Sequence, residues 1–318
     1  MYDREKLLVQ VATLYYESNL TQMQIGKRLH LSRPTVSQLL KEARDTGVVS
    51  ITINHPMSKQ TLDQEKISTH YSISSTHIAD SSYSEEATKS KLGLLCSTYI
   101  ESRLFNLNTI GIGWGSSLYH FVESANNIIS DNLIIVPLMG GVGMTNIKLH
   151  ANHLAFKLSE KYNADVAYFY APAFAENKKM KEMFETSQQY QEIYQKGLQV
   201  DLAVIGIGNP LNSSTYKQLN YFSDEEIKEL ENSDAIGDIL GSFFDLEGNA
   251  ISTTVTGRML GISISDLPKI KEKVVIASGT EKYKAISVLL NNNLVDHLFI
   301  DQELANLLLE NIEKGNSN

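Results

Sequence analysis

The segment from residue 33 to residue 41 carries side chains that can read DNA bases. Its apolar residues recur at the spacing of one helix face, which leaves outward-facing positions at Arg33, Thr35, Ser37, Gln38 and Lys41. Gln can bond adenine through two atoms, Arg can do the same to guanine, and the methyl group of Thr can touch thymine. Cations such as Lys27 and Arg28 are better placed for phosphates, which fix register without reading sequence.

Two short helices with a tight turn must hold these side chains. Thr21 and Gln24 form a T-x-x-Q capping box that should start a helix at Gln22. Ser32 can cap the next helix, and Pro34 suits its first turn. The pattern predicts a helix-turn-helix, which places one helix in the major groove; the alternative is a helical hairpin with a merely solvated polar face. The expected DNA-contacting residues are Thr21, Lys27, Arg28, Ser32, Arg33, Thr35, Ser37, Gln38 and Lys41.

The segment GIGWGSS is suited to hold an anion. It follows an apolar stretch typical of a strand and precedes a helical pattern. Backbone N–H groups beside Gly113 and Gly115, with the hydroxyls of Ser116 and Ser117, would then lie at a helix N-terminus, where a phosphate binds well. The spacing is not G-x-G-x-x-G, so a dinucleotide is not favoured. A tight strand-to-helix turn without any ligand is the alternative.

A second candidate loop contains the pair Gly140 and Gly141, which allows close approach of the backbone to a ligand. His150 and Asn152 follow it and can bond sugar hydroxyls. A lone His is more often a packing or surface residue, so His150 by itself is weak support.

Further candidates follow the later strands. Gly208 ends a long apolar stretch, and Lys282 begins a helix just past another strand, where its ammonium can reach a phosphate. Asp245 can accept hydrogen bonds from sugar hydroxyls. Taken one at a time, Asp245 and Lys282 would equally fit a surface charge pair.

Charge is divided unevenly along the 318 residues. Residues 1–55 hold seven Lys and Arg against five Asp and Glu, a net charge of +2, and the whole chain carries −9, so the remainder carries −11. An acidic bulk argues against broad coating of nucleic acid and fits a small DNA-contacting head on a different body. A head of +2 should bind weakly alone, so we expect oligomers that place several heads on one operator.

Several other classes of protein are not favoured. The eight His and the single Cys96 show no metal-ligand spacing, and neither a G-x-S-x-G elbow nor a Walker loop is present. We therefore expect no metal, no cofactor and no catalytic residue. One thiol, no apolar leader and no apolar run long enough for a bilayer together predict a cytoplasmic protein without membrane contact.

The rest of the chain alternates short apolar stretches with helical patterns, which predicts a Rossmann-like α/β body with a mostly parallel sheet. The expected strands are 109–113, 133–139, 165–171, 201–208, 235–244 (only partly strand), 273–279 and 297–301. The expected helices are 86–103, 116–128, 147–161, 177–196, 224–230, 281–291 and 301–313. We expect a winged-helix-like head over residues 1–56, with a strand at 48–54 as its wing. Residues 57–84 would be a linker and the start of the effector domain, and residues 85–318 an effector and oligomerisation domain.

These pieces together resemble the SorC family (SorC/DeoR type) of bacterial sugar-responsive transcription regulators. The resemblance runs nearly end to end and rests on the head together with GIGWGSS, VPLMGG, VIGIGN, AIGDILGSFFDLEGN and VVIASGTEKYKAI in that order. It implies a sugar-binding domain shaped like glucosamine-6-phosphate deaminase and ribose-5-phosphate isomerase, without enzymatic duty. It also implies homodimers or homotetramers and a phosphorylated sugar as effector.

Carried onto this chain, the resemblance assigns phosphate to Ser116, Ser117 and Lys282, and the sugar to His150, Asn152 and Asp245. One position departs from other members, which place a charged or amine-bearing side chain where Met139 stands. An imine to an aldehyde sugar cannot form at Met139, which points to a ketose or polyol phosphate.

The sequence therefore predicts a regulator of a carbohydrate operon that binds operator DNA under control of a phosphorylated sugar or polyol. One rival is a sugar-phosphate isomerase or deaminase with an appended head, with Asp245 and His150 as the only candidates for its acid/base pair. A second rival is a DNA-binding protein whose body only oligomerises.

Overall fold

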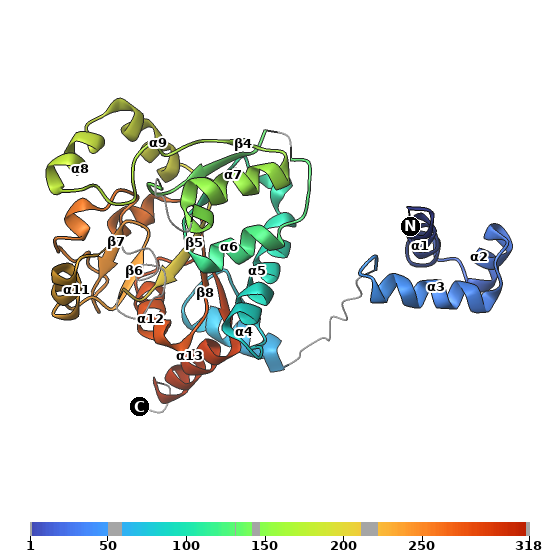
Figure 1. Ribbon diagram of the computed structural model, residues 1–318. Coiled ribbons are helices and arrows are strands. Elements are labelled where there is room, and N and C mark those ends of the chain that lie inside the picture. The colour runs from blue at the N-terminus through green and yellow to red at the C-terminus, as the bar shows by residue number, and fades with distance from the viewer. Residues whose placement is uncertain (1, 50–58, 131, 142–146, 211–221, 316–318) are drawn as a thin grey trace. The chain divides into compact units, whose positions relative to one another are not determined.

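The chain forms two compact units in the computed structural model, one from Met1 to Ser58 and one from Lys59 to Asn318 (Figure 1). The structure describes residues 2–49, 59–130, 132–141, 147–210 and 222–315. The strand expected over residues 48–54 lies largely outside the described residues. The wing and the domain boundaries at residues 56 and 84 therefore stay predictions.

The first unit is a small helical bundle. It consists of α1 (Tyr2–Ala12) with a π-helical turn (Thr13–Glu17), α2 (Gln22–Leu29) and α3 (Arg33–Asp45). Its core is apolar side chains at helical spacing, of which Val11, Ile25, Val36 and Leu39 are fully buried. Burial of this kind contributes about 1.5–3 kcal/mol per large apolar side chain. The expected helix-turn-helix is confirmed.

A parallel sheet organises the second unit. Its strands lie in the order β1-β9-β8-β5-β2-β3-β4, and every pair along that order is parallel. The bounds are β1 (Ser75–Ala79), β2 (Thr109–Ile112), β3 (Ile134–Pro137), β4 (Asp165–Val166), β5 (Leu202–Gly208), β8 (Lys273–Ala277) and β9 (His297–Asp301). An antiparallel hairpin of β6 (Gly237–Ile239) and β7 (Ser242–Phe244) pairs with the end of β5.

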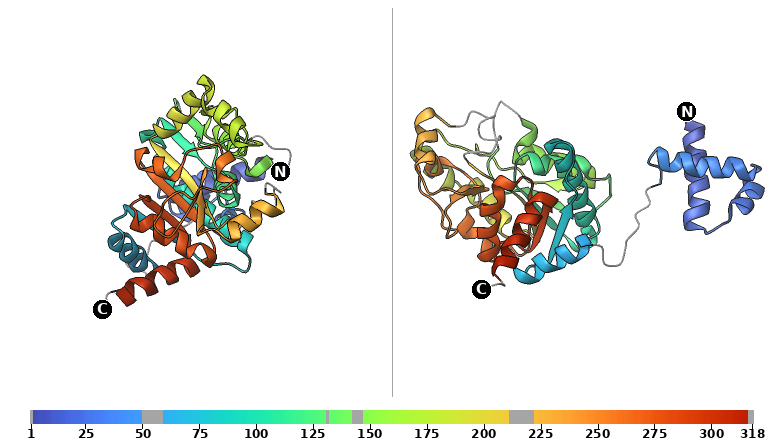
Figure 2. Two further views of the ribbon diagram at one scale, coloured as in Figure 1. Left: turned by 90° about the vertical axis from the view of Figure 1, so that its left-hand side faces the viewer. Right: turned by 90° about the horizontal axis from the view of Figure 1, so that it is seen from below.

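Helices cover both faces of the sheet (Figures 1 and 2). Packed on one face are α5 (Glu85–Glu101), α6 (Ser116–Ser124) and α7 (Ala151–Tyr162). Packed on the other are α4 (Lys59–His70), α9 (Gln188–Leu198), α12 (Tyr283–Asn291) and α13 (Gln302–Gly315). Alternate residues of β5 serve the two cores, because successive strand side chains point to opposite faces. The predicted α/β fold class is confirmed.

The direction in which the chain crosses the sheet reverses between β2 and β5. From β2 the chain moves to β3 and β4 on one side, and from β5 it moves to β8 and β9 on the other. Crossover helices on opposite faces leave a crevice at such a reversal, and ligands of open α/β sheets bind there, beyond the carboxyl ends of the strands. The loops that follow β2 and β5 are therefore the first place to look for a site.

Helix α4 protects the free edge of β1. The side chain of Gln64 accepts a hydrogen bond from the Ile78 N–H at 2.9 Å, and that of Gln60 donates to the Ile78 carbonyl at 2.9 Å. An uncovered edge strand would offer its backbone groups to another chain. Ile67 on the same helix is fully buried in the core, so α4 is part of the second unit rather than a free linker.

Three elements differ from their predicted form. The strand expected at 165–171 pairs only over Asp165–Val166. The helix expected at 177–196 is two helices, α8 (Lys178–Glu185) and α9, because the hydroxyl of Ser187 accepts from the Tyr190 N–H and starts a new helix. The segment 235–244 is the β6–β7 hairpin, which turns at Leu240 with a φ of +49°.

Candidate functional site

The two helices of the first unit are held by the caps that the sequence predicts. Thr21 and Gln24 bond reciprocally in a capping box, and Ser32 accepts a hydrogen bond from the Thr35 N–H at 3.2 Å. The hydroxyls of Ser32 and Thr35 are 2.7 Å apart. The Thr21 and Ser32 hydroxyls are thus engaged in fixing helix starts, which is a local role beside any contact with DNA.

The outer face of α3 is polar and open to solvent. Arg33, Ser37 and Lys41 follow one another at intervals of four residues, Gln38 lies beside them, and all four are exposed. Thr35 is half-buried. Successive residues at this spacing share one face of a helix, so the structure brings these predicted base and phosphate contacts together. The exposed Lys27 and Arg28 stand in the last turn of α2.

The turn between α2 and α3 depends on a residue that the sequence reading missed. A Cβ on Gly26 would lie 2.6 Å from the carbonyl oxygen of Leu31, so the turn packs directly on the helix backbone. His30 closes α2 in the left-handed conformation with a φ of +55°. The signal for Gly26 is its position inside a helical pattern, where glycine is unfavourable unless close packing requires it.

In the second unit, the loop after β2 opens directly into α6. Gly115 has a φ of +108°, which favours glycine, and its N–H donates to the Leu149 carbonyl at 3.0 Å. Among the described residues, no side chain caps α6, and no atom outside the chain neighbours lies within 4 Å of a Cβ built on Gly115. The first N–H groups of α6 therefore remain available to an anion, beside the half-buried Ser116 and the buried Ser117.

Gly113 itself is buried in the wall of this loop. Its N–H donates to the Val204 carbonyl of β5 at 3.0 Å, and a Cβ there would lie 3.0 Å from the side chain of Leu240. Gly113 therefore allows the loop to pack against β5 and the β6–β7 hairpin.

The structure brings the second glycine loop to the same place. A Cβ on Gly141 would lie 3.5 Å from the Cβ of His150, and Gly140 lies so close to the next segment that its Cβ would meet the Pro172 carbonyl oxygen at 2.1 Å. The rings of His150 and Trp114 have centroids 6.4 Å apart. His150 is buried and stands immediately before α7. The loops after β2 and β3 thus share one wall with His150.

Asn152 holds its neighbourhood together. Its amide nitrogen donates to the Phe169 carbonyl at 3.0 Å, and its amide oxygen accepts from the Phe169 N–H at 2.9 Å. The side chain replaces a strand partner just where β4 ends. An amide can make four hydrogen bonds, so a sugar contact at Asn152 stays compatible with this structural role.

Lys282 lies at the carboxyl end of β8 and is buried. Its ammonium donates to the Ser278 carbonyl at 2.7 Å. Burial lowers the pKa of Lys282, and attraction to the carboxylates of Glu281 and Asp238 partly opposes that shift. The amine keeps two further donors for an anion, as an ammonium has three.

Asp238 is a site residue that the sequence reading missed. It is buried on β6, which pairs with the end of β5, and a Cβ on Gly208 would lie 2.2 Å from its Oδ1. Gly208 is required because this carboxylate packs against its Cα. The available signal was an acid flanked by apolar residues in the run AIGDI.

Asp245 is half-buried and directly follows β7. Its Oδ1 accepts from the N–H groups of Glu247 and Asn249 at 3.0 and 2.8 Å, which closes the turn after β7. A Cβ on Gly248 in that turn would meet Asn292 at the C-terminal end of α12. Lys282 precedes the N-terminal end of the same helix.

Met139 is fully buried in an apolar cluster with Trp114, Phe174, Phe243 and Met259. A Cβ on Gly261 would lie 2.5 Å from the Met139 Cβ, so the two backbones pack closely. The cluster gives the site an apolar wall at this position.

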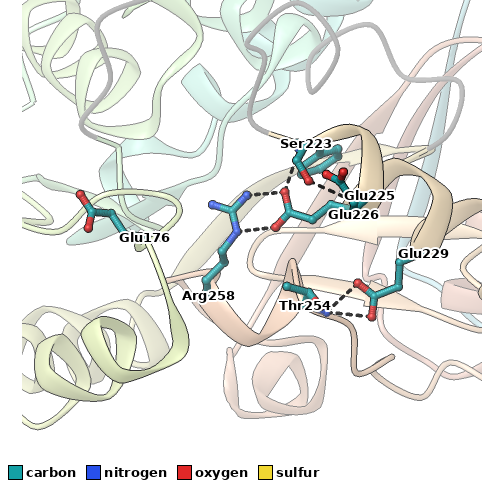
Figure 3. A pocket seen from close by; sticks show the side chains of 8 residues that line it. Glu176, Ser223, Glu225, Glu226, Glu229, Thr254 and Arg258 are labelled. Carbon is teal, nitrogen blue, oxygen red and sulfur yellow. Dashed lines mark hydrogen bonds and ion pairs between the residues drawn. The ribbon is translucent and has the colours of Figure 1, made fainter.

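A separate pocket lies between α11 (Asp224–Glu231) and the turn Thr256–Arg258 (Figure 3). Arg258 forms two hydrogen bonds with Glu226, at 2.8 and 2.9 Å, and Glu229 accepts from the Thr254 N–H. The carboxylate of Glu225 also lines this pocket, so the pocket lining is mainly acidic. An anionic ligand is better matched by the loops at the strand reversal.

Two further searches limit the chemistry of the described residues. They contain no group of three or more His, Cys, Asp or Glu side chains that could hold a metal ion. Within the same part of the chain, no helix combines the length and the apolar character needed to cross a bilayer.

Comparison with known proteins follows the division into two units. Residues 55–310 match the family model described as "Putative sugar-binding domain", and residues 3–46 match "Sigma-70, region 4". The chain is 27% identical to the deoxyribonucleoside regulator of Bacillus subtilis, over 98% of this chain and 100% of that protein. It is 28% identical to the sorbitol operon regulator of Klebsiella pneumoniae, over 97% and 99%. The crystal structure of that full-length Klebsiella regulator superimposes with a TM-score of 0.84, covering 96% of this chain and 98% of the other.

Proposed function

Because the chain belongs to the SorC/DeoR-type family of sugar-responsive transcription regulators, we propose that a phosphorylated sugar or polyol binds its second unit and thereby controls operator DNA binding by its first. Its role as a DNA-binding transcription regulator with a sugar-binding domain follows from the family. The phosphate on the effector, the residues that bind it, a homodimeric or homotetrameric assembly and a cytoplasmic location are parts of the proposal.

One observation carries the effector proposal. The uncapped start of α6 and the ammonium of Lys282 follow β2 and β8, the strands on either side of β5 and next to the strand reversal. A helix N-terminus and a buried ammonium both favour an anion, and together they favour a phosphate. Asp238, His150 and the backbone beside Gly141 stand around this position and would meet the hydroxyls of the sugar.

The apolar wall at Met139 limits the kind of carbohydrate. No amine stands at that position to form an imine with an aldehyde, so we propose a ketose or polyol phosphate as the effector. The relatives described above are regulators, which favours a regulator over the enzyme rival. Asp245, one half of the acid/base pair that this rival requires, has its Oδ1 engaged in closing a turn.

Control of DNA binding follows from linkage. An effector that binds one arrangement of the oligomer better than another shifts the population of heads placed to fit an operator. A coupling of about 1–3 kcal/mol would change operator affinity roughly 5- to 150-fold.

The effector proposal is tested by titrating the full chain with sugars and their phosphate esters. Sorbitol and deoxyribose, each compared with its own phosphate, form matched pairs suggested by the names of the two relatives; sorbitol is a polyol, whereas deoxyribose is an aldose and serves as the comparison that the proposal disfavours. Trp114 is the only tryptophan of the chain and stands in the loop after β2, so its fluorescence reports on this site. We expect a response to a phosphate ester and none to the free carbohydrate at the same concentration. A response to neither member of any pair would refute the phosphorylated effector.

Two substitutions assign the roles. Lys282→Met should weaken binding of the phosphate ester about 10-fold or more, because a charge-assisted bond is lost, whereas Lys284→Met, at an exposed position of α12, should not. Gln38→Ala should reduce the affinity for operator DNA much more than the affinity for unrelated DNA, since it removes a base contact. Equal losses on both DNAs, measured by fluorescence anisotropy, would exclude Gln38 as a base reader.

A further inference from the structure

Helices α5 and α6 run side by side in the same direction. Both follow parallel strands, so both start at the carboxyl edge of the sheet. Near the start of α5, Glu86 contacts His120 at 2.9 Å, and farther along, the hydroxyl of Ser97 lies 3.4 Å from the Ser124 carbonyl. Between these contacts, a Cβ on Gly93 would lie 2.5 Å from the His120 carbonyl. The two helices therefore pack at close range with matching turns.

This packing places Lys89 at the start of α6. Lys89 stands four residues before Gly93 and hence on the same helix face, one turn nearer the carboxyl edge. It therefore faces the turn of α6 that precedes His120, which is the turn that begins at Ser116. Lys89 is only 4% exposed, so its side chain is held inside the protein rather than in solvent.

Lys89 is within electrostatic range of Lys282. Burial is the main cause that lowers the pKa of Lys282, attraction to Glu281 opposes it, and repulsion from Lys89 lowers it further. The two ammonium groups come from different faces of the sheet, and Lys282 is 7% exposed. Two like charges under such burial are unfavourable unless an anion joins them.

The carboxylates around the pair differ in burial. Glu85 forms an ion pair with Lys89 but its side chain is 69% exposed, and Glu281 lies 4.0 Å from Lys282 with its side chain 42% exposed. The buried members of the group are two bases, Lys89 and Lys282, and one acid, Asp238. The exposed Glu85 can leave Lys89 for solvent when a stronger anion arrives.

We propose that Lys89 is a second cationic residue of the effector site, which with Lys282 selects a doubly charged phosphate monoester over a singly charged sugar acid or a neutral sugar. Glu85 occupies Lys89 while the effector is absent, and a phosphate oxygen takes its place. The inference rests on the proposed function of the same site and adds a residue that no sequence motif indicated.

The experiment uses the full chain and inorganic phosphate as the probe, at about pH 8, where phosphate is mostly a dianion. Binding is followed by Trp114 fluorescence for wild type, Lys89→Met, Glu85→Gln and the control Lys91→Met, which alters an exposed lysine on the same helix. Gluconate serves as the singly charged comparison ligand. The sugar phosphates that bind wild type are then measured in the same way.

We expect Lys89→Met to weaken phosphate binding about 10- to 100-fold, as loss of a buried charge-assisted bond should, and Lys91→Met to match wild type. Glu85→Gln should bind phosphate more tightly because a competing carboxylate is gone. Equal phosphate affinity for Lys89→Met and wild type would overturn the role of Lys89 and leave the phosphorylated effector in place. If Lys89→Met does not fold, weaker or unchanged binding by Glu85→Gln overturns it instead. A wild-type protein that binds neither phosphate nor any sugar phosphate removes both proposals.

Discussion

Acidification should destabilise the second unit through a half-buried histidine. His77 on β1 stacks on Phe299 with ring centroids 4.3 Å apart, and its Nε2 lies 2.9 Å from the Ser75 hydroxyl. Burial and, to a smaller extent, repulsion from the nearby His297 lower the pKa of His77 to about 4. The groups that face His77 are His297 and the Tyr99 ring on α5.

Ion pairing surrounds the second histidine of this cluster. His297 contacts Glu272 at 2.5 Å, and Glu272 also receives two hydrogen bonds from Arg103, at 2.5 and 2.8 Å. Burial lowers the pKa of His297, and the bond to Glu272 partly opposes that shift. Protonation of His297 should therefore also destabilise the folded state, but the bond to Glu272 reduces this effect.

The sign and size follow from linkage. An unfolded His titrates near pH 6.5, whereas folded His77 stays neutral until about pH 4. Its stabilising contribution is therefore complete above pH 6.5 and is lost as the pH falls toward 4, because the unfolded chain binds the proton first. Between about pH 8 and pH 5 the loss is at most about 2 kcal/mol, and about 1–2 kcal/mol after allowance for partial solvent exposure.

Urea unfolding followed by Trp114 fluorescence measures this loss in the full chain, because the only tryptophan lies in the second unit. The free energy of unfolding should fall between pH 8 and pH 5 in wild type. In His77→Phe, which keeps an aromatic ring on Phe299 but cannot titrate, the fall should be smaller by about 1–2 kcal/mol. The same pH dependence in both proteins would show that His77 is not the group responsible.

Three further substitutions test the local geometry. His30→Gly should stabilise the first unit by about 0.5–1 kcal/mol, because glycine adopts its φ of +55° without strain; a lower melting temperature by circular dichroism would contradict this. Gly140→Ala should destabilise the second unit by about 1–3 kcal/mol in urea, since its Cβ would lie 2.1 Å from the Pro172 carbonyl oxygen. The control Gly257→Ala, with no described atom within 4 Å, should change stability by less than about 0.5 kcal/mol, and equal effects would refute the argument. Gln64→Ala should lower the free energy of unfolding by about 1–3 kcal/mol, because it leaves a backbone N–H of β1 unpaired. An unchanged urea unfolding curve would contradict this prediction.

Features set by neighbouring residues were predictable from the sequence. The caps at Thr21 and Ser32 and the succession of strands and helices rest on patterns within a few residues, and the structure confirms them. The predicted ends of helices and strands were wrong where a single side chain changed the local hydrogen bonding. Ser187 restarts a helix inside one continuous helical pattern, and the Asn152 side chain replaces the strand partner of Phe169.

The candidate site was predictable only in part, because it is assembled across the sheet. The glycine loops and Lys282 could be predicted because they follow apolar strands. The positions of Asp238 and Lys89 depend on contacts between segments far apart in the sequence.

The uneven distribution of charge along the chain affects how an anion could be bound by the second unit. The chain beyond residue 55 carries −11, and a unit so acidic repels an anionic effector at long range. Selective binding then requires cations that are close to the ligand and shielded from the surrounding carboxylates. Lys89 and Lys282 are both less than one tenth exposed, whereas Glu85 and Glu281 remain in solvent, where their fields are screened, and Asp238 is the buried carboxylate that acts on Lys282. Burying two lysines is unfavourable for folding, and an anionic effector of the kind proposed would offset that cost.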